Sequence, residues 1–268
     1  MNSIVLAVII VSAIGLIAGL GLSIASKIFA VPVDEKAEQI RECLPGANCG
    51  ACGYSGCDGY AAALSKGETT DTALCAPGGN DTAKAIGEIT GLAAGEVKPM
   101  AAVVLCQGHN VNATTKLEYQ GVYSCKMASQ IFGGPKDCIY GCIGYGDCMA
   151  VCEYDAITIC DGIARINPYL CKACKMCVKT CPKGLIEMMP LEETKAAVLC
   201  KNHDKGALTR KECTAGCIGC MKCVKECEAG AVTIDRFCAT VDYEKCTGCG
   251  KCHAVCPVGA IDVITLIK

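Results

Sequence analysis

Cysteine is the residue type of this chain that can do chemistry, and it occurs in runs of regular spacing. The 268 residues include 27 cysteines. That share reaches the level that usually marks small disulfide-stapled secreted domains, yet the chain is several times longer than such domains. An odd count also leaves one thiol unpaired in any scheme built only from disulfides. With no Trp, three Phe and nine Tyr, large side chains supply little core, so bound metal is the expected source of folding energy.

Two cysteine runs carry the full bacterial ferredoxin signature, with spacings of two, two and three residues before a final Cys-Pro. They are Cys171-x2-Cys174-x2-Cys177-x3-Cys181-Pro182 and Cys246-x2-Cys249-x2-Cys252-x3-Cys256-Pro257. A third run, Cys217-x2-Cys220-x2-Cys223-x3-Cys227, has Glu228 in place of the proline. A variant run, Cys138-x3-Cys142-x5-Cys148-x3-Cys152, has Tyr145 where the third run has Cys220. The full motifs predict [4Fe-4S] clusters rather than zinc sites or disulfides.

These runs belong to an internal repeat. A shift of 75 residues superimposes nine cysteines on nine others, including Cys125 on Cys200 and Cys138 on Cys213. In ferredoxins, three cysteines of a run bind one cluster and the fourth binds the other. This rule predicts four sites, with Cys138 taking the place of a third ligand: Cys138, Cys142, Cys148 and Cys181; Cys152, Cys171, Cys174 and Cys177; Cys217, Cys220, Cys223 and Cys256; Cys227, Cys246, Cys249 and Cys252.

Another cysteine block lies closer to the N-terminus. It has the spacing Cys49-x2-Cys52-x4-Cys57, with glycines between the cysteines, and Cys75 lies 18 positions further on. The glycines allow the backbone to approach an inorganic core closely. Four cysteines could also hold tetrahedral zinc, but the compact glycine-lined triad favours a fifth [4Fe-4S] cluster.

Seven cysteines remain: Cys43, Cys106, Cys125, Cys160, Cys200, Cys213 and Cys238. Cys106 and Cys200 end the similar segments AAVVLC and AAVLC. The hypothesis is a sixth cluster bound by Cys106, Cys125, Cys200 and Cys213. The alternative is that these four are buried small hydrophobic residues, as free cysteines often are. Cys43, Cys160 and Cys238 have no partners at useful spacing and are expected to be inert.

The elements that position these cysteines can be read from residue patterns. Residues 34–43, 58–68 and 81–97 have helical composition, and 156–167 and 231–242 alternate apolar and polar residues about a turn, as hairpins do. The predicted fold class is α+β, with a transmembrane anchor (1–30), a 4Fe-4S domain (31–98) and two ferredoxin-like modules of the two-cluster bacterial type (99–199 and 200–268).

The anchor is the uncharged run of 22 residues from Ile4 to Ala25. As a helix it spans about 33 Å, enough for a hydrocarbon core of ~30 Å. A cleaved signal peptide is the rival interpretation, but no basic residue precedes the run and it exceeds the usual apolar length. We expect the anchor to cross the cytoplasmic (inner) membrane once, with the cluster-bearing part in the cytoplasm. Lys27 lies on the C-terminal side of the run, and a reducing compartment keeps thiol ligands available.

Other chemistry has little support in the sequence. His109, His203 and His253 are scattered, and surface or capping roles are expected for them. There is no G-x-G-x-x-G after a strand and no P-loop, so no nucleotide or flavin site can be recognised. A formal charge of −2 offers no basic excess for nucleic acid.

The order of these features resembles one family, the B subunit of the Rnf ion-translocating ferredoxin:NAD⁺ oxidoreductase. The resemblance rests on the N-terminal helix, the block LPGANCGACGYSGCDGYA closed by Cys75, and the tandem ferredoxin motifs. It implies a membrane-bound electron-transfer subunit of a redox enzyme, without a complete NAD site of its own. Electrons would come from soluble reduced ferredoxin and pass to partner subunits with flavin and NAD sites, coupled to Na⁺ or H⁺ transport. The alternatives are a polyferredoxin subunit of another membrane complex, such as a hydrogenase, and a zinc-rich scaffold without redox function.

Overall fold

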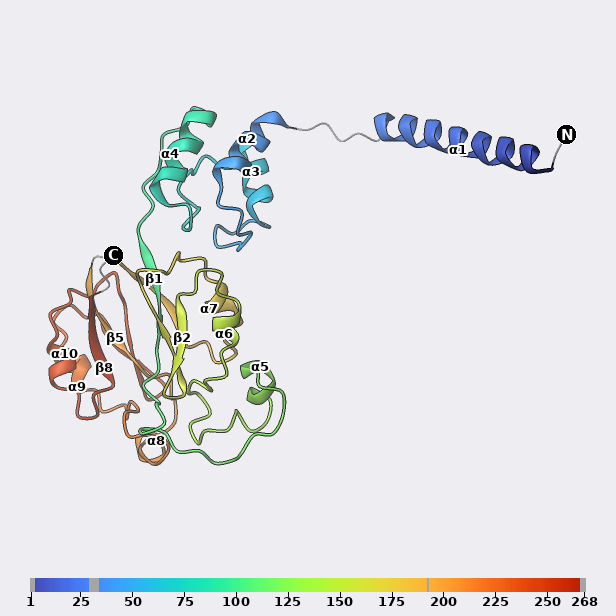
Figure 1. Cartoon of the computed structure of the whole chain (residues 1–268). Coiled ribbons are helices and arrows are strands. Elements are labelled where there is room, and N and C mark those ends of the chain that lie inside the picture. The colour runs from blue at the N-terminus through green and yellow to red at the C-terminus, as the bar shows by residue number, and fades with distance from the viewer. Residues whose placement is uncertain (1–2, 29–33, 192, 266–268) are drawn as a thin grey trace.

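The computed structural model describes residues 3–28, 34–191 and 193–265. A long N-terminal helix, α1 (Ser3–Ile28), precedes a small helical domain and a larger mixed body (Figure 1). Within α1, the span Val5–Lys27 is long and apolar enough to cross a membrane, and none of it is buried against the rest of the chain. The anchor expected at 1–30 therefore corresponds to a candidate membrane span, while residues 1, 2, 29 and 30 lie outside the described residues.

The small domain consists of α2 (Glu35–Cys43), α3 (Cys57–Ser65) and α4 (Gly79–Thr90). The Asp34 side chain caps α2 by accepting hydrogen bonds from the Lys36 and Ala37 amides. Ile40, Tyr60, Leu64 and Ile86 form its core with the cysteines. Helix α4 ends seven residues before the predicted position 97, because Gly91 adopts φ +77° and terminates it.

The described residues of the body include eight short strands in four antiparallel pairs. The pairs are β1 (Met100–Val104) with β4 (Ile186–Pro190), β2 (Ile157–Cys160) with β3 (Ile163–Ile166), β5 (Thr194–Val198) with β8 (Ile261–Thr265), and β6 (Val232–Asp235) with β7 (Cys238–Val241). Six short helices connect them: α5 (Cys125–Ser129), α6 (Asp147–Ala150), α7 (Met176–Thr180), α8 (Gly206–Glu212), α9 (Lys222–Lys225) and α10 (Lys251–Ala254). Both predicted hairpins are confirmed as β2–β3 and β6–β7. In the first, Asp161 and Gly162 have φ of +48° and +75°, as a tight hairpin turn requires.

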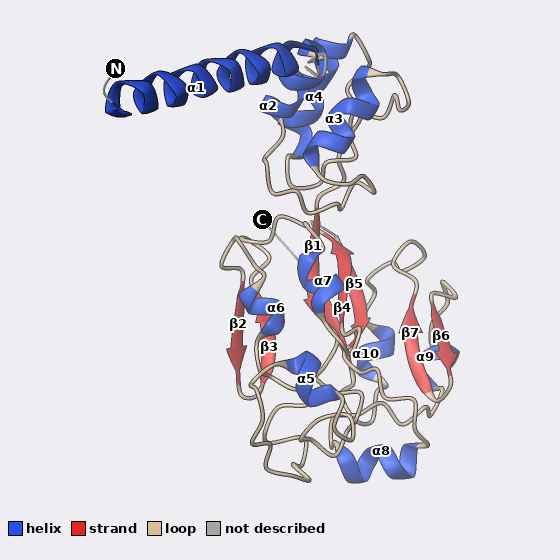
Figure 2. Ribbon diagram, turned by 90° about the vertical axis from the view of Figure 1, so that its right-hand side faces the viewer, coloured by secondary structure: helices blue, strands red, loops and turns tan. Residues whose placement is uncertain are grey.

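The body is built from two similar halves, here called repeat 1 (100–190) and repeat 2 (194–265). In each, an outer strand pair encloses a hairpin and two cysteine runs, and the two hairpins lie on opposite sides of the central strands (Figure 2). Side chains of β1, β4 and β5, among them Ala101, Met189 and Ala197, pack into one core between the repeats.

Strand pairing places the boundary between the two repeats earlier in the sequence than the predicted boundary between the modules. The expected boundary between 199 and 200 would assign β5 to the first half, but β5 pairs with β8 at the end of the second. Because β1 and β5 have equivalent partners, Cys106 and Cys200 occupy equivalent positions just beyond them. Their backbones agree: Leu105 donates to the Leu185 carbonyl, and Leu199 donates to the Ala260 carbonyl.

Candidate iron–sulfur sites

Site I lies in the small domain, where Cys49, Cys52, Cys57 and Cys75 line one cavity with about 320 Å³ of space between the atoms. The loop carrying the first three cysteines is tight: a Cβ at Gly56, where φ is +100°, would stand 2.9 Å from the Asn48 Oδ1. The Asn48 oxygen instead accepts a hydrogen bond from the Cys57 amide at 2.9 Å. Helix α3 then returns the chain so that Cys75 closes the site, and the grouping is the one the sequence predicts.

Site II lies in repeat 1 and also has the predicted members. Cys152, Cys171, Cys174 and Cys177 line a cavity of about 350 Å³ between the hairpin and α7. Burial, and then the neighbouring Cys171 and Cys174, raise the pKa of the Cys177 thiol to about 11. Four thiols gathered here would not ionise together without a compensating positive group.

Site III differs from the expectation at one cysteine. Its cavity, of about 370 Å³, is lined by Cys142, Cys148, Cys181 and Cys125, not Cys138. Tyr145 occupies the motif position of Cys220, and it packs against Tyr119 and Tyr123, with ring centroids 5.7 and 5.1 Å away. Tyr119, Tyr123 and Cys125 lie between Cys106 and Cys138, in a connection that is longer than its counterpart in repeat 2: Cys106 and Cys138 are 32 positions apart, whereas Cys200 and Cys213 are 13 apart. This connection, which is 19 residues longer in repeat 1, includes Cys125, the fourth cysteine of site III.

Asp147 holds this inserted segment in place. Its carboxylate accepts hydrogen bonds from the Ser124 hydroxyl at 2.9 Å, the Cys125 amide at 2.9 Å and the Lys126 amide at 3.0 Å. Although burial opposes ionisation, these bonds keep the pKa of Asp147 below its ordinary value. The acid lies next to Cys148 in the sequence, so one short helix positions two cysteines of the site.

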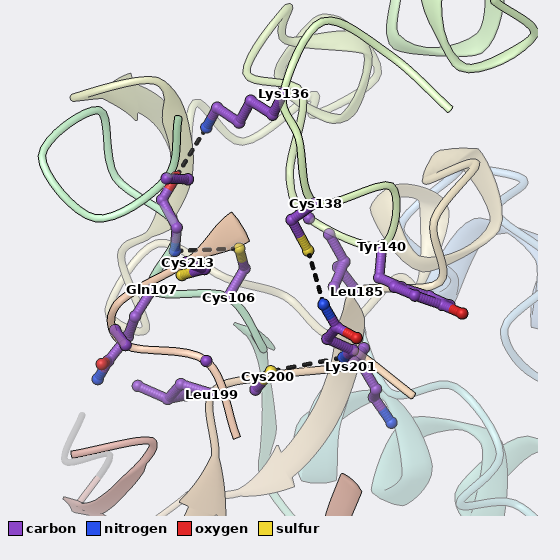
Figure 3. Close-up of a pocket in the computed structure, with 16 residues that line it drawn as sticks. Cys106, Gln107, Lys136, Cys138, Tyr140, Leu185, Leu199, Cys200, Lys201 and Cys213 are labelled. Atoms are coloured by element: carbon purple, nitrogen blue, oxygen red, sulfur yellow. Dashed lines mark hydrogen bonds between the residues drawn. The ribbon is translucent and has the colours of Figure 1, made fainter. Parts of the chain in front are cut away.

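Site IV is formed where the two repeats meet. Cys106, Cys138, Cys200 and Cys213 line a cavity of about 400 Å³, two from each repeat (Figure 3). The sixth group of the sequence hypothesis thus forms with Cys138 in place of Cys125. The shift of 75 aligned Cys125 with Cys200, but the strands make Cys106 the true equivalent of Cys200. The similarity of AAVVLC to AAVLC, and of Lys136-Asp137-Cys138 to Lys211-Glu212-Cys213, could have revealed this grouping.

A buried lysine lies beside site IV. Lys136 is only 6% exposed, and its Nζ donates to the Gly108 and Gly162 carbonyls at 2.7 and 2.8 Å. Burial lowers the pKa of Lys136, while the neighbouring Cys106 and Cys142 act to raise it. Among the ion pairs of the described residues, none joins a carboxylate to Lys136, so an anionic group bound by the cysteines would supply a counter-charge to this buried ammonium.

Sites V and VI lie in repeat 2 with the predicted members. Cys217, Cys220, Cys223 and Cys256 are neighbours at candidate site V, and Cys227, Cys246, Cys249 and Cys252 are neighbours at candidate site VI. Burial raises the pKa of Cys223 to about 11, and the other three cysteines of site V contribute. Burial likewise raises the pKa of Cys252, with contributions from the other three of site VI. Cys220 and Cys249 are exposed, whereas Cys174, the equivalent of Cys249, is half-buried.

Three cysteines lie outside these groups, as expected: Cys43 is half-buried, Cys160 exposed and Cys238 fully buried. The histidines have structural contacts. His203 Nδ1 and His253 Nδ1 lie 3.1 and 2.7 Å from the carbonyls of Asp235 and Ile261. His109 Nε2 lies 2.8 Å from Arg165.

The donor set and its surroundings fit iron–sulfur clusters. Each group consists of four thiols, and backbone amides point at their sulfurs, for example Gly108 to Cys106 at 3.3 Å and Ala260 to Cys256 at 3.3 Å. Among the described residues, no three His, Cys, Asp or Glu side chains stand close enough to bind a single ion. Wider groups of four thiols around a cavity suit a polynuclear core, whose positive charge would keep buried thiols deprotonated.

The sites form a continuous series. Lys179 donates to the Cys49 carbonyl at 3.0 Å, joining site I to repeat 1. Cys49 also contributes to the raised pKa of Cys174 in site II, after burial as the main cause. Sites II and III share one core. The Cys142 amide of site III donates to the Cys106 sulfur of site IV at 3.4 Å, and the Cys217 amide of site V donates to the Cys200 sulfur of site IV at 3.3 Å. Site IV therefore adjoins both site III and site V. Sites V and VI share a second core.

Comparison with known proteins agrees with these sites. A family model described as "Putative Fe-S cluster" matches residues 44–77, and one described as "4Fe-4S binding domain" matches residues 239–262. The B subunit of the Na(+)-translocating ferredoxin:NAD(+) oxidoreductase complex of Acetobacterium woodii is 43% identical, over 91% of this chain and 73% of that protein. The B subunit of the ion-translocating oxidoreductase complex of Methanosarcina acetivorans is 39% identical, over 88% and 92%. The B subunit of the proton-translocating ferredoxin:NAD(+) oxidoreductase complex of Clostridium ljungdahlii is 36% identical, over 90% and 85%.

These similarities extend over most of each chain and include the cysteine-rich segments. They identify an iron–sulfur electron-transfer subunit that works with the other subunits of a redox enzyme complex. The chain belongs to the B subunits of the Rnf-type ion-translocating oxidoreductase complexes.

Proposed function

We propose that this chain is the membrane-anchored electron relay of an ion-translocating ferredoxin:NAD⁺ oxidoreductase. It would accept electrons from reduced ferredoxin and pass them along six [4Fe-4S] clusters, at sites VI, V, IV, III, II and I, to partner subunits that hold the flavins and the NAD site. Helix α1 would cross the inner membrane once, with all six clusters in the cytoplasm. Two ferredoxin-like modules of the two-cluster type, repeats 1 and 2, would carry sites II, III, V and VI.

The observation that carries this proposal is the position of site IV. With two cysteines from each repeat, it fills the gap between sites III and V, and a cluster there would join two ferredoxin-like modules into one path. Without it, the two modules would be separate electron carriers on one chain.

The two ends of the path differ, which suggests its direction. At one end, Lys179 donates to the Cys49 carbonyl of the small domain, Cys49 is a neighbour of Cys174 in site II, and this domain follows α1 in the sequence. At the other, the equivalent Cys249 of site VI is exposed. A soluble donor would reach site VI, and electrons would leave from site I beside the membrane.

The test is to remove the connection while keeping both ends. The whole chain, purified anaerobically with its partner subunits in mild detergent, should contain about 24 iron atoms, four for each of six clusters. Cys213→Ala should lose about four of them. Reduced ferredoxin should then still reduce sites V and VI rapidly, and sites I to III only slowly, in stopped-flow absorbance with rapid-freeze EPR.

The control is Cys160→Ala, which removes an exposed cysteine outside every site. It should retain all the iron and wild-type kinetics. Unchanged iron in Cys213→Ala would exclude site IV, and equally fast reduction of all remaining clusters would exclude the series.

A further inference from the structure

The two repeats present almost the same hydrogen bonds to equivalent ligand sulfurs. In repeat 1, the Cys106 sulfur accepts from the amides of Gly108 (3.3 Å) and Cys142 (3.4 Å). In repeat 2, the Cys200 sulfur accepts from the amides of Asn202 (3.4 Å) and Cys217 (3.3 Å).

The next pair of sulfurs matches as well. The Cys142 sulfur accepts from the backbone of Ala164 and Gly144. The Cys217 sulfur accepts from the equivalent Ala239 and Gly219. The backbone therefore offers equivalent amide donors to the Cys142 sulfur of site III and to the Cys217 sulfur of site V.

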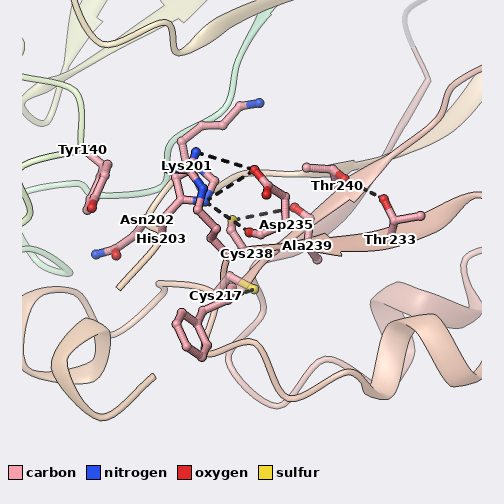
Figure 4. Close-up of polar contacts among 12 residues, drawn as sticks. Tyr140, Lys201, Asn202, His203, Cys217, Thr233, Asp235, Cys238, Ala239 and Thr240 are labelled. Carbon is pink, nitrogen blue, oxygen red and sulfur yellow. Dashed lines mark hydrogen bonds and ion pairs between the residues drawn. The ribbon is translucent and has the colours of Figure 1, made fainter. Parts of the chain in front are cut away.

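One side chain breaks the match. Ile163 in repeat 1 and Cys238 in repeat 2 are equivalent positions 75 residues apart, and both are completely buried. Ile163 packs between Cys106 and Leu185 with only methyl groups. Cys238 packs in the same way against Cys217 and Cys200, but its side chain is a thiol. Figure 4 shows Cys238 beside Cys217.

The Cys238 thiol has several acceptors within reach. Its sulfur lies 3.3 Å from the Cys200 carbonyl oxygen and 3.6 Å from that of Ala239, and it packs in one buried core with Cys200 and Cys217, whose sulfurs are the ligands proposed for sites IV and V. When those two sulfurs are thiolate ligands, they are the better acceptors, because a hydrogen bond to an ionised partner is stronger than one to a neutral carbonyl.

We propose that Cys238 donates its S–H to the ligand sulfurs of Cys200 and Cys217 and thereby makes the clusters of sites IV and V easier to reduce. Cys238 is not a ligand but a neighbour that sets their potentials. Reduction adds negative charge to the cluster and its sulfurs, and a donor that points at them stabilises the reduced form. Site III, with Ile163 at this position, lacks that contribution. The inference rests on the proposed cluster sites.

The repeats supply their own test variants. Cys238→Ile copies repeat 1, Cys238→Ala removes the thiol without added bulk, Cys238→Ser restores a donor, and Ile163→Cys transfers the thiol to the other repeat. Each is made in the full chain, and the midpoint potentials of all centres are measured by EPR-monitored redox titration, together with iron content.

Cys238→Ala and Cys238→Ile should retain all iron and shift one or two centres to lower potential. The expected change in the reduction equilibrium is about tenfold, which is 59 mV for a one-electron centre. Cys238→Ser should return those centres towards wild type, and Ile163→Cys should shift a different centre upward.

Two results would overturn the inference. Unchanged potentials in a Cys238→Ala protein with full iron would show that the thiol does not influence the clusters, and a loss of about four irons would make Cys238 a ligand. A wild-type chain without six clusters would instead refute the proposed function, so the two failures are distinguishable.

Discussion

Asp147→Ala is expected to empty site III alone. The Asp147 carboxylate accepts three hydrogen bonds from the start of α5, the helix that begins with Cys125. A hydrogen bond to a charged group contributes about 1.5 kcal/mol at the low end, so three contribute about 4.5 kcal/mol. At 1.4 kcal/mol per factor of ten, their loss shifts the equilibrium between docked and released α5 about 10³-fold.

Iron content and EPR of the anaerobically purified chain measure the outcome. With Cys125 released, site III has three cysteines, and the chain should lose up to about four of its ~24 irons, all from one centre. The matched control is Lys222→Ala, because Lys222 is the equivalent of Asp147 in repeat 2 and is exposed. Full iron and an unchanged set of centres in Asp147→Ala would refute the reasoning that Asp147 positions a ligand.

Two further perturbations probe buried groups. Lys136→Met removes the buried ammonium beside sites III and IV, so the midpoint potentials of those two centres should fall. The control is Lys211→Met, which removes the exposed lysine at the equivalent position of repeat 2. Equal potentials in the two variants would contradict the charge argument. Tyr60→Phe removes the hydroxyl that donates to the Asp71 carbonyl at 2.7 Å, and the loss should lower the free energy of unfolding, measured with guanidinium, by about 1–2 kcal/mol. Burial raises the pKa of Tyr60 above its ordinary 10.0. The stability that the Tyr60 hydroxyl contributes should therefore be complete below pH 10.0 and decline as the pH rises further. The same decline in the Tyr60→Phe chain would contradict this assignment.

Much of the chain could be predicted because ligand spacing is local. The motifs around Cys171 and Cys246, and the first block from Cys49 to Cys75, each group their own cysteines within a short stretch. Their membership of sites I, II, V and VI follows from sequence distance and the cross-ligation rule. The hairpins followed from alternation and a turn, which are also local properties.

The exchange of Cys125 and Cys138 could not be predicted in this way. The repeat shift of 75 comes from the runs of regular spacing and does not account for the longer connection in repeat 1. The similar segments that end at Cys106 and Cys200 suggest that these two cysteines are equivalent, and the pairing of β1 with β4 and of β5 with β8 shows it. The positions of Asp147 and Lys136 depend on the same long-range packing.

Site IV also has a consequence for how the protein is made. Its cysteines extend from position 106 to position 213, so a cluster there joins backbone positions 107 residues apart. A cross-link that closes a loop of about 100 residues removes roughly 4.7 kcal/mol of conformational freedom from the unfolded chain. The chain must have been synthesised through Cys213, and the parts of the two repeats that carry these cysteines must have packed together, before the four thiols can meet. Cluster insertion at site IV would therefore depend on the packing of the two repeats against each other, and only a chain in which they have packed would have an unbroken electron path.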